Sequence, residues 1–397
     1  MKHVIVGDSA AGVNAALAIR KTNPEDEIVI VERGRYLYYG RVLISYFIDG
    51  RVPYTGLFLA DDLFYQKKRL KLMLDRAVCE IDSENRTLPL SNGEMLDYDR
   101  LLIASGASPK KLNVEGERLG GVFYLRTMDD AAAIKIWARR SKKVVIVGGG
   151  LVSLKSFESL RAMGIKATFV ISSERVLSQM LDVDSSALVE NFLRGMGADF
   201  RFGSSVERIE GKRRVERAVL STGEKLDADM VIVGKGVVPN TFGGLRTNRG
   251  IIVDRGMKTS EDGIFAAGDA AEGYDILSGE NRVNALWPIA CEEGVVAGCN
   301  MAGEDRIYTG ALPMNSLPLM GMNISSIGEI SGRDVMVLKN PYRRFVFDGN
   351  RLTGAVIFGN APFGVLRKLI IKGTGITDRG ILKKSPFNIG AKTTLML

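Results

Sequence analysis

The chain opens with Met1-Lys2-His3-Val4-Ile5-Val6-Gly7-Asp8-Ser9-Ala10-Ala11-Gly12, and this stretch decides the fold. Its apolar run ends at Val6 and predicts a buried strand. The small residues that follow open an alanine-rich helix to about Lys21, and a second strand is expected at Ile28–Val31. A turn of this kind directs backbone N–H groups and the positive end of the helix dipole at a pyrophosphate. The opening therefore predicts a dinucleotide-binding strand-turn-helix-strand unit.

One acidic residue strengthens this interpretation. Glu32 ends the second strand, 20 residues after Gly12, and an acid at about that distance accepts hydrogen bonds from a ribose diol. The turn itself departs from the Gly-x-Gly-x-x-Gly pattern, because Ser9 stands where the middle glycine is usual. The competing interpretation is a purely structural turn followed by a surface Glu. The strand before the turn and the helix after it favour nucleotide binding.

The same pattern returns 141 residues later. An apolar strand is predicted at Val144–Val147, then the turn Gly148-Gly149-Gly150-Leu151-Val152-Ser153, a helix to about Met163 and a strand at Ala167–Ile171. Alternating strands and helices are typical of a parallel, doubly wound sheet. The chain is therefore predicted to have an α/β fold with two Rossmann-like dinucleotide-binding domains.

The end of the second strand, where a ribose-binding acid is expected, is less regular in the second strand-turn-helix-strand pattern than in the first. Ile171 occupies the position at which an acid is expected. Loss of that acid removes the usual discrimination against a 2′-phosphate, and Ser172, Ser173 and Arg175 could instead contact one. NAD and NADP therefore both stay open as the nucleotide.

The rest of the chain changes character at about Gly310. Strand-turn-helix character returns between about Ser260 and Ala302. Beyond Gly310, short β-like runs precede one helix at about Phe363–Lys372, which indicates a small α+β domain. The runs are Ser325–Glu329, Val335–Leu338, Arg344–Phe347 and Ala355–Phe358.

The composition is that of an ordinary globular protein, with 46% hydrophobic and 25% charged residues among 397. No run of apolar residues is long enough to predict a membrane span, and the N-terminus enters a strand without a secretion signal. Three cysteines, Cys79, Cys291 and Cys299, form no CxxC or CxxxxC pair, which indicates free thiols in a reducing cytoplasm. No metal site is expected.

Positive charge is concentrated at the end of the chain. The net charge is +8, and the segment from Ser331 onward holds 12 Lys and Arg against 3 Asp and Glu. Such a segment can attract an acidic partner and speed its association. A solvated or subunit-facing surface is an equally good interpretation. The segment has neither the aromatic-and-glycine motif nor the zinc spacing of a nucleic-acid module.

Taken together, the motifs resemble those of the FAD-dependent pyridine-nucleotide oxidoreductase family. Further segments match the family's pattern in the same order: Tyr98–Ala107, Val231–Asn240, Gly263–Ala270, Trp287-Pro288 and Glu292–Gly294. By resemblance, the first two are crossings between domains, the third is the second FAD motif, and the last two lie beside the flavin ring. The resemblance implies an FAD domain at 1–110 and 235–310, an NAD(P) domain at 111–234, and a C-terminal α+β interface domain at 311–397.

The resemblance also implies cofactor-binding residues. Those for FAD are Gly7, Ser9, Ala10, Ala11, Gly12, Glu32, Arg33, Arg41, Val78, Ala104, Ser105, Gly106, Gly268, Asp269 and Trp287. Those for NAD(P)H are Gly148, Gly150, Leu151, Val152, Ser153, Ser172, Ser173, Arg175, Gly234 and Gly236. Arg41 and Trp287 are implied to act catalytically at the flavin, with Arg41 stabilising negative charge on the reduced ring. Asp269 is implied to bind the ribityl hydroxyls.

The branch of the family is narrowed by residues that the chain lacks. There is no cysteine pair for a redox disulfide, and the only histidine lies in the first strand. What remains resembles the rubredoxin reductases and the flavin portion of assimilatory nitrite reductases. Their Tyr-x-Lys/Arg-Pro-x-x-Ser segment is matched by Tyr39, Arg41 and Ser45, with Val42 where proline is usual. Lys155 stands where many relatives have Glu.

The predicted function is transfer of electrons from NAD(P)H through FAD to an external acceptor, because the chain offers no disulfide to receive them. A small acidic redox protein of the rubredoxin or ferredoxin type would match the basic segment. Three alternatives stay open: an NAD(P)H oxidase or quinone reductase, a flavoprotein subunit of a larger redox complex, and a redox-sensing binding flavoprotein. A homodimer is also open, nucleic acid is not expected as a partner, and no transmembrane segment is expected.

Overall fold

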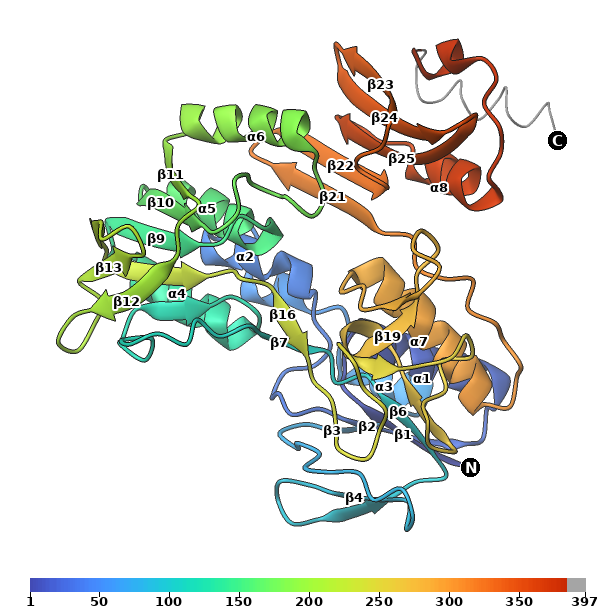
Figure 1. Cartoon of the computed structure of the whole chain (residues 1–397). Helices are drawn as coiled ribbons and strands as arrows, with labels where there is room; N and C mark the ends of the chain where they lie inside the picture. The colour runs from blue at the N-terminus through green and yellow to red at the C-terminus, as the bar shows by residue number, and fades with distance from the viewer. Residues whose placement is uncertain (384–397) are drawn as a thin grey trace. The chain divides into compact units, whose positions relative to one another are not determined.

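Buried parallel strands followed by glycine turns organise both halves of the chain (Figure 1). The computed structural model describes residues 1–383, so residues 384–397, the end of the predicted C-terminal domain and of its basic segment, lie outside the described residues. The chain forms two units. Unit 1 comprises Met1–Gly40, Tyr54–Ser108 and Val237–Pro313, and unit 2 comprises Arg41–Pro53, Pro109–Gly236 and the chain from Met314 onward.

Unit 1 is built on a five-stranded parallel sheet. The strand order is β18 (Ile264–Ala266), β6 (Arg100–Ile103), β1 (Lys2–Val6), β2 (Glu27–Val31) and β3 (Lys71–Met73). Val4 of β1 pairs with Val29 on one side and Leu101 on the other. All three side chains are fully buried, as expected for a parallel sheet covered on both faces.

Two helices of unit 1 touch backbone to backbone. α1 (Ala10–Thr22) follows β1, and α7 (Trp287–Met301) packs along it. A Cβ at Gly294 would lie 2.2 Å from the carbonyl oxygen of Ala11, and Gly298 repeats this close approach one turn later. Only glycine permits such contact, which brings the last part of unit 1 onto its first helix.

Smaller elements complete unit 1. α3 (Asp62–Lys68) is capped by Asp61, whose side chain accepts a hydrogen bond from the backbone N–H of Phe64. The others are η2 (Tyr54–Leu57), the hairpin β4 (Thr87–Pro89) with β5 (Met95–Asp97), the ribbon β7 (Ala107–Pro109) with β16 (Val237–Pro239), η3 (Gly268–Ala270), and the sheet β17 (Ile251–Ile252), β19 (Ala271–Tyr274) and β20 (Asn281–Arg282).

Unit 2 repeats the parallel architecture. Its central sheet has the order β11 (Ala198–Phe202), β10 (Lys166–Ile171), β9 (Lys143–Val147), β15 (Met230–Val233) and β8 (Val122–Tyr124). An antiparallel sheet of β12 (Val206–Glu210), β13 (Arg217–Leu220) and β14 (Lys225–Asp227) is added. The helical elements are η1 (Arg41–Leu43), α2 (Ile44–Ile48), α4 (Met128–Ala138), α5 (Leu151–Ala162) and α6 (Val183–Gly195). α4 begins with a capping box formed by Thr127 and Asp130.

The C-terminal part of unit 2 is an antiparallel sheet with one helix. The strand order is β21 (Met314–Leu319), β22 (Met322–Gly328), β25 (Arg351–Phe358), β24 (Tyr342–Asp348) and β23 (Asp334–Lys339). α8 (Phe363–Lys372) packs on β22 and β25, and η4 (Arg379–Lys383) follows. Arg344 forms ion pairs with Asp182 and Asp184 at the start of α6, at 3.5 and 3.6 Å. The small sheet is therefore anchored to the parallel part of unit 2.

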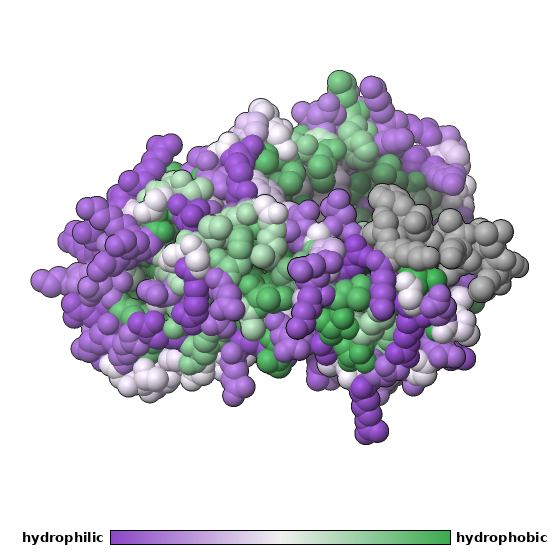
Figure 2. Space-filling model, turned by 90° about the horizontal axis from the view of Figure 1, so that it is seen from above, coloured by the Kyte–Doolittle hydropathy of each residue, from purple (hydrophilic) through white to green (hydrophobic). Residues whose placement is uncertain are grey.

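The predicted α/β fold with a small C-terminal α+β part is confirmed by the two parallel sheets and the antiparallel sheet that follows them. The three-domain division stays a prediction. Hydrophilic residues, in purple, cover much of the face seen in Figure 2. Within residues 1–383, none of the helices combines the length and the apolar character that crossing a membrane requires.

Candidate functional site

The first glycine turn joins β1 to α1. Gly7 has a φ of +115°, and a Cβ there would lie 2.3 Å from the carbonyl oxygen of Ala104. A Cβ at Gly12 would lie 2.0 Å from the carbonyl oxygen of Gly7. Ser9 is the N-cap of α1, but its side chain caps no backbone N–H, and the first turn carries no acid. The N–H groups at the start of α1 therefore suit an anion such as the FAD pyrophosphate.

Glu32 lies beside this turn at the end of β2. Its carboxylate accepts hydrogen bonds from the backbone N–H of Asp8 at 2.9 Å and of Gly34 at 2.8 Å. Each carboxylate oxygen can accept a second hydrogen bond, so both can still receive ribose hydroxyls. Arg33 is exposed, and Val78 lies in a β-bridge.

Gly268, the residue before Asp269, lies against the start of α1, although the two are far apart in the sequence. A Cβ at Gly268, whose φ is +74°, would lie 3.1 Å from the Cβ of Ala11. The backbone N–H of Gly268 donates to Glu293 Oε2 at 2.8 Å. Burial raises the pKa of the Glu293 carboxyl to about 8, against the effect of that hydrogen bond. The motif at 292–294 contains Glu293, but nothing in the sequence marks this carboxyl as buried.

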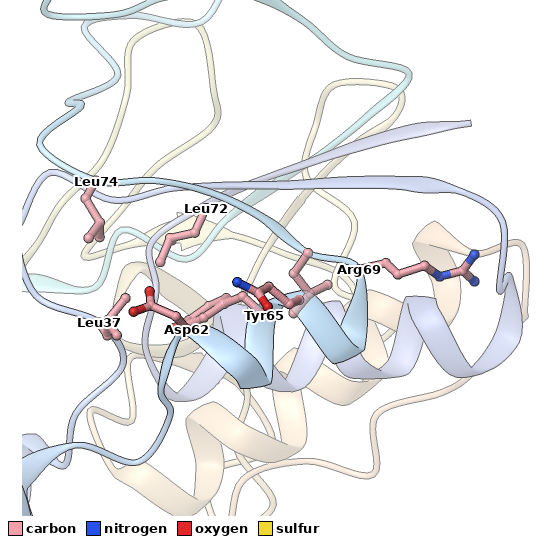
Figure 3. Close-up of a pocket in the computed structure, with 8 residues that line it drawn as sticks. Leu37, Asp62, Tyr65, Arg69, Leu72 and Leu74 are labelled. Atoms are coloured by element: carbon pink, nitrogen blue, oxygen red, sulfur yellow. The ribbon is translucent and has the colours of Figure 1, made fainter.

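Asp8 and Tyr65 form a buried contact that the sequence motifs do not predict. The Tyr65 hydroxyl donates to Asp8 Oδ2 at 2.6 Å and accepts from the backbone N–H of Tyr38 at 3.1 Å. Burial raises the pKa of the Tyr65 hydroxyl, and Asp8 raises it further. Tyr65 also lines an open groove, in which Figure 3 shows Leu72 and Leu74 opposite α3. None of the predicted cofactor-binding residues lines this groove.

Trp287 is the first residue of α7, and its ring stacks on that of Tyr38. The ring centroids are 6.0 Å apart and the planes differ by 10°. Burial raises the pKa of the Tyr38 hydroxyl to about 12, and Cys291 and Asp8 add to the shift. The two rings form an aromatic wall in unit 1 that is suited to flank a flat ring system.

The crossing segment after β6 is joined to the returning chain. Ser105 Oγ donates to the carbonyl oxygen of Asn240 at 2.8 Å, and Asn240 Nδ2 donates to the carbonyl oxygen of Ser105 at 2.9 Å. The backbone N–H of Asn240 donates to Gly106, whose φ is +67°. These bonds fix the Ala104–Gly106 segment beside the first glycine turn, because Ala104 also contacts Gly7.

The second glycine turn joins β9 to α5. A Cβ at Gly148, whose φ is +107°, would lie 2.3 Å from the carbonyl oxygen of Gly234. A Cβ at Gly234 would lie 2.4 Å from Ser153 Oγ, and Ser153 is fully buried. Gly150 is the N-cap of α5, which begins at Leu151 with no acid in its first turn. The turn therefore suits the pyrophosphate of NAD(P)H, and Ser153 serves as the small residue at the contact.

The loop after β10 has no carboxylate at the ribose position. Ile171 is 2% exposed and packs beneath the turn, where a Cβ at Gly149 would lie 2.9 Å from its Cδ1. Ser172 is exposed, and Ser173 Oγ donates to the carbonyl oxygen of Arg175 at 3.0 Å. Arg175 Nε is buried without a hydrogen-bond partner. The loop therefore offers the hydroxyl groups of Ser172 and Ser173 and the guanidinium of Arg175, together with the exposed carboxylate of Glu174.

Arg41 lies in unit 2, at the start of η1. Its Nη1 donates to the carbonyl oxygen of Arg126 at 3.4 Å. The following helix, α2, is held by Lys135 Nζ, which donates to the carbonyl oxygen of Phe47 at 2.6 Å. The segment 41–53 is thus part of the unit that carries the second glycine turn, although its sequence neighbours on both sides belong to unit 1.

The predicted residues are brought together in two groups. All of the predicted FAD residues except Arg41 lie in unit 1. Arg41 and all of the predicted NAD(P)H residues, including the exposed Val152 and Gly236 with its φ of +88°, lie in unit 2. The assignment of single residues to each cofactor stays a prediction.

Comparison with known proteins identifies the family. Residues 1–294 match the model of the pyridine nucleotide-disulphide oxidoreductases, and residues 313–374 match the C-terminal domain of rubredoxin NAD+ reductase. The chain is 31% identical over 409 residues to the NADH-dependent phenylglyoxylate dehydrogenase subunit epsilon of Aromatoleum evansii, covering 98% of this chain and 96% of the relative. It is 29% identical over 345 residues to rubredoxin-NAD(+) reductase of Pseudomonas putida, covering 85% and 89%.

A solved structure is similar over almost the whole chain. The ferredoxin reductase for the CYP199A2 system from Rhodopseudomonas palustris superposes with a TM-score of 0.92 at 25% identity, covering 98% of this chain and 99% of the other. The predicted family, cofactors and enzyme class are confirmed by these comparisons. The chain therefore belongs to the pyridine nucleotide-disulphide oxidoreductase family and is an FAD-dependent NAD(P)H oxidoreductase.

Proposed function

We propose that the enzyme passes electrons from NAD(P)H through FAD to a small acidic redox protein of the rubredoxin or ferredoxin type. The observation that carries the proposal is the match of residues 313–374 to the C-terminal domain of rubredoxin NAD+ reductase. Most of this region lies in the segment that holds 12 Lys and Arg against 3 Asp and Glu, which favours an acidic partner. The three cysteines are free, which supports an acceptor outside the chain.

The residues of the chain bind and orient the two cofactors. When bound, FAD supplies the chemistry that accepts hydride from NAD(P)H and releases electrons singly. The N–H groups at the start of α1 would hold the pyrophosphate of FAD, and Glu32 would orient its ribose. The stacked Trp287 and Tyr38 rings would flank one side of the flavin ring. Arg41 would supply a cation that stabilises negative charge on the reduced flavin ring.

Anaerobic stopped-flow mixing tests the proposal. The FAD-loaded enzyme is mixed with NADH and NADPH in parallel, and then with a rubredoxin or a [2Fe-2S] ferredoxin. We expect loss of flavin absorbance followed by reduction of the iron protein, at a rate that falls as the salt concentration rises. Flavin reduction without transfer to either protein, together with steady peroxide formation in air, would identify an NAD(P)H oxidase instead. Negligible turnover with every acceptor would favour a redox-sensing protein.

A second candidate function is that of a flavoprotein subunit in a larger redox complex. It is favoured by the 31% identity, over nearly the full length of both chains, to a protein named as a subunit of a dehydrogenase. Native-source purification through an affinity tag tests it. Stoichiometric recovery with iron-sulfur subunits would establish the complex, and recovery of the single chain or of a homodimer would reject it.

We also propose the cytoplasm as the location, on the basis of the free thiols. The division into an FAD domain, an inserted NAD(P) domain and a C-terminal interface domain is likewise proposed. Limited proteolysis with and without each nucleotide tests that division, because ligand-protected fragments should end near residues 110, 235 and 311.

A further inference from the structure

Lys155 and Glu158 lie one turn apart on α5 and form an ion pair at 2.6 Å. Lys155 Nζ also donates to the hydroxyl of Tyr46 in α2 and to the carbonyl oxygen of Pro318 in β21, each at 2.6 Å. These three acceptors match the three donors of an ammonium group, and the side chain is 14% exposed. Lys155 is therefore fully engaged by protein groups.

Glu158 makes the complementary contacts. Its Oε1 accepts from Arg51 Nη1 at 2.9 Å and from the backbone N–H of Met320 at 3.2 Å. Burial raises the pKa of the Glu158 carboxyl, but the hydrogen bonds from Lys155 and Arg51 outweigh burial and hold the pKa below its usual range. The carboxylate is therefore charged at neutral pH and paired on both sides.

The ion pair joins three stretches that are distant in the sequence. Each of its two side chains contacts the 41–53 segment, and each contacts β21 or the turn directly after it. α2, α5 and β21 lie side by side in Figure 1. A buried hydrogen bond of 2.7 Å from Ser159 Oγ to the carbonyl oxygen of Ser45 strengthens the attachment of α2. The 41–53 segment is thus held by α5 as well as by α4.

We propose that Lys155 and Glu158 are positioning residues for flavin reduction, which hold the 41–53 segment, and Arg41 with it, in a fixed place relative to the nucleotide-binding turn. α5 begins at Leu151, so the pair lies within about two turns of the N–H groups that suit the NAD(P)H pyrophosphate. Arg41 opens η1, directly ahead of α2. The inference rests on the proposed function, in which Arg41 acts at the flavin.

The charged contacts explain why the 41–53 segment would be held in one place relative to α5. Each donor here has its acceptor at hydrogen-bond distance, whereas an apolar contact would tolerate sliding along the helix. Loss of Glu158 leaves the Lys155 ammonium buried without a carboxylate partner, which is costly to the fold, whereas loss of Lys155 leaves Glu158 paired with Arg51 alone. Loss of both leaves no such charge, so a double apolar replacement should keep the fold and release the segment.

The experiment therefore uses the double variant Lys155→Met/Glu158→Leu as the FAD-loaded enzyme. In anaerobic stopped-flow mixing with NADH and NADPH, we expect the limiting rate of flavin reduction to fall about tenfold or more. The dissociation constant of the donor should change by less than about threefold, because the glycine turn is untouched. Arg201→Met/Glu224→Leu is the matched control, since this ion pair of 2.8 Å in unit 2 involves none of the three stretches. It should leave both values unchanged.

A mutant cycle with Arg41→Met decides whether the pair acts through Arg41. If it does, adding Lys155→Met/Glu158→Leu to the Arg41→Met variant lowers the limiting rate of flavin reduction by less than about twofold, because the shared effect is already lost. Multiplicative effects, or an unchanged limiting rate in the double variant, overturn the inference. Tyr46→Phe, which removes one hydrogen bond, should slow reduction about two- to fivefold and decides the matter should the double variant not fold.

The two proposals fail in different ways. If neither donor reduces the flavin of the wild-type enzyme, the proposed function fails and the positioning role with it. If the wild-type enzyme is reduced normally and the variants equal it, only the positioning role is rejected.

Discussion

Glu293 of α7 accepts a hydrogen bond of 2.8 Å from the backbone N–H of Gly268, the residue that precedes Asp269. Its side chain is almost fully buried, and burial disfavours the charged form of a carboxyl. The pKa of Glu293 is raised to about 8, although the hydrogen bond acts in the opposite direction. Asp269 and Glu292 are the other charged groups that raise it. A titrating group therefore supports the segment that is predicted to be the second FAD motif.

We expect Glu293→Gln to gain stability over the wild type as the pH rises. The neutral carboxyl contributes stability that is fully present below about pH 4.5 and is lost as the pH rises through the raised pKa of about 8. Each pKa unit corresponds to about 1.4 kcal/mol, so the difference in unfolding free energy should widen by about 4 kcal/mol between pH 5 and pH 8. Urea unfolding followed by circular dichroism measures it. A difference that stays constant over this range would contradict the prediction.

Gly294→Ala should destabilise the protein and weaken FAD retention. The new Cβ would lie 2.2 Å from the carbonyl oxygen of Ala11, so α1 must shift, together with its start, where we propose that the FAD pyrophosphate binds. Overpacking of this kind costs about 1–3 kcal/mol. Gly195→Ala at the end of α6 is the control, because its Cβ would meet no atom within 4 Å. Thermal unfolding and flavin content after gel filtration report both effects, and equal behaviour of the two variants would refute the contact argument.

The two glycine turns could be predicted because their signals are local. The expected strands and helices around both turns end within one residue of β1, α1, β2, β9, α5 and β10. The predicted C-terminal helix coincides with α8. Hydrophobic periodicity and the glycines at the boundaries of strands and helices suffice in these places, since neither signal depends on distant residues.

Features that depend on distant contacts could not be predicted. β21 is not among the predicted strands. It contains Pro318, and it lies at the edge of its sheet, where a missing N–H is tolerated. The attachment of the 41–53 segment to unit 2 follows from hydrogen bonds to α4 and α5. No local pattern encodes those partners, and the same holds for the burial of Glu293.

Arg175→Gln should change the preference between nucleotides. Ile171 supplies no carboxylate to repel a 2′-phosphate, so we expect the wild type to oxidise both NADH and NADPH. The Arg175 guanidinium, with its buried Nε without a hydrogen-bond partner, is the cation of that loop. The variant should lose about tenfold in kcat/KM for NADPH and less than about twofold for NADH. Equal losses with both donors would assign Arg175 a structural role instead.

Lys368→Glu/Lys372→Glu should slow electron transfer to an acidic acceptor while leaving flavin reduction unchanged. Both side chains are exposed, and they lie four residues apart on α8, so they share one face of the helix. Charge reversal replaces attraction by repulsion, and kcat/KM for the acceptor should fall about tenfold at low salt and less at high salt. Lys67→Glu/Lys68→Glu on α3 is the matched control, with the same change in net charge on unit 1. If the two variants slow the acceptor equally, net charge rather than an α8 surface governs docking.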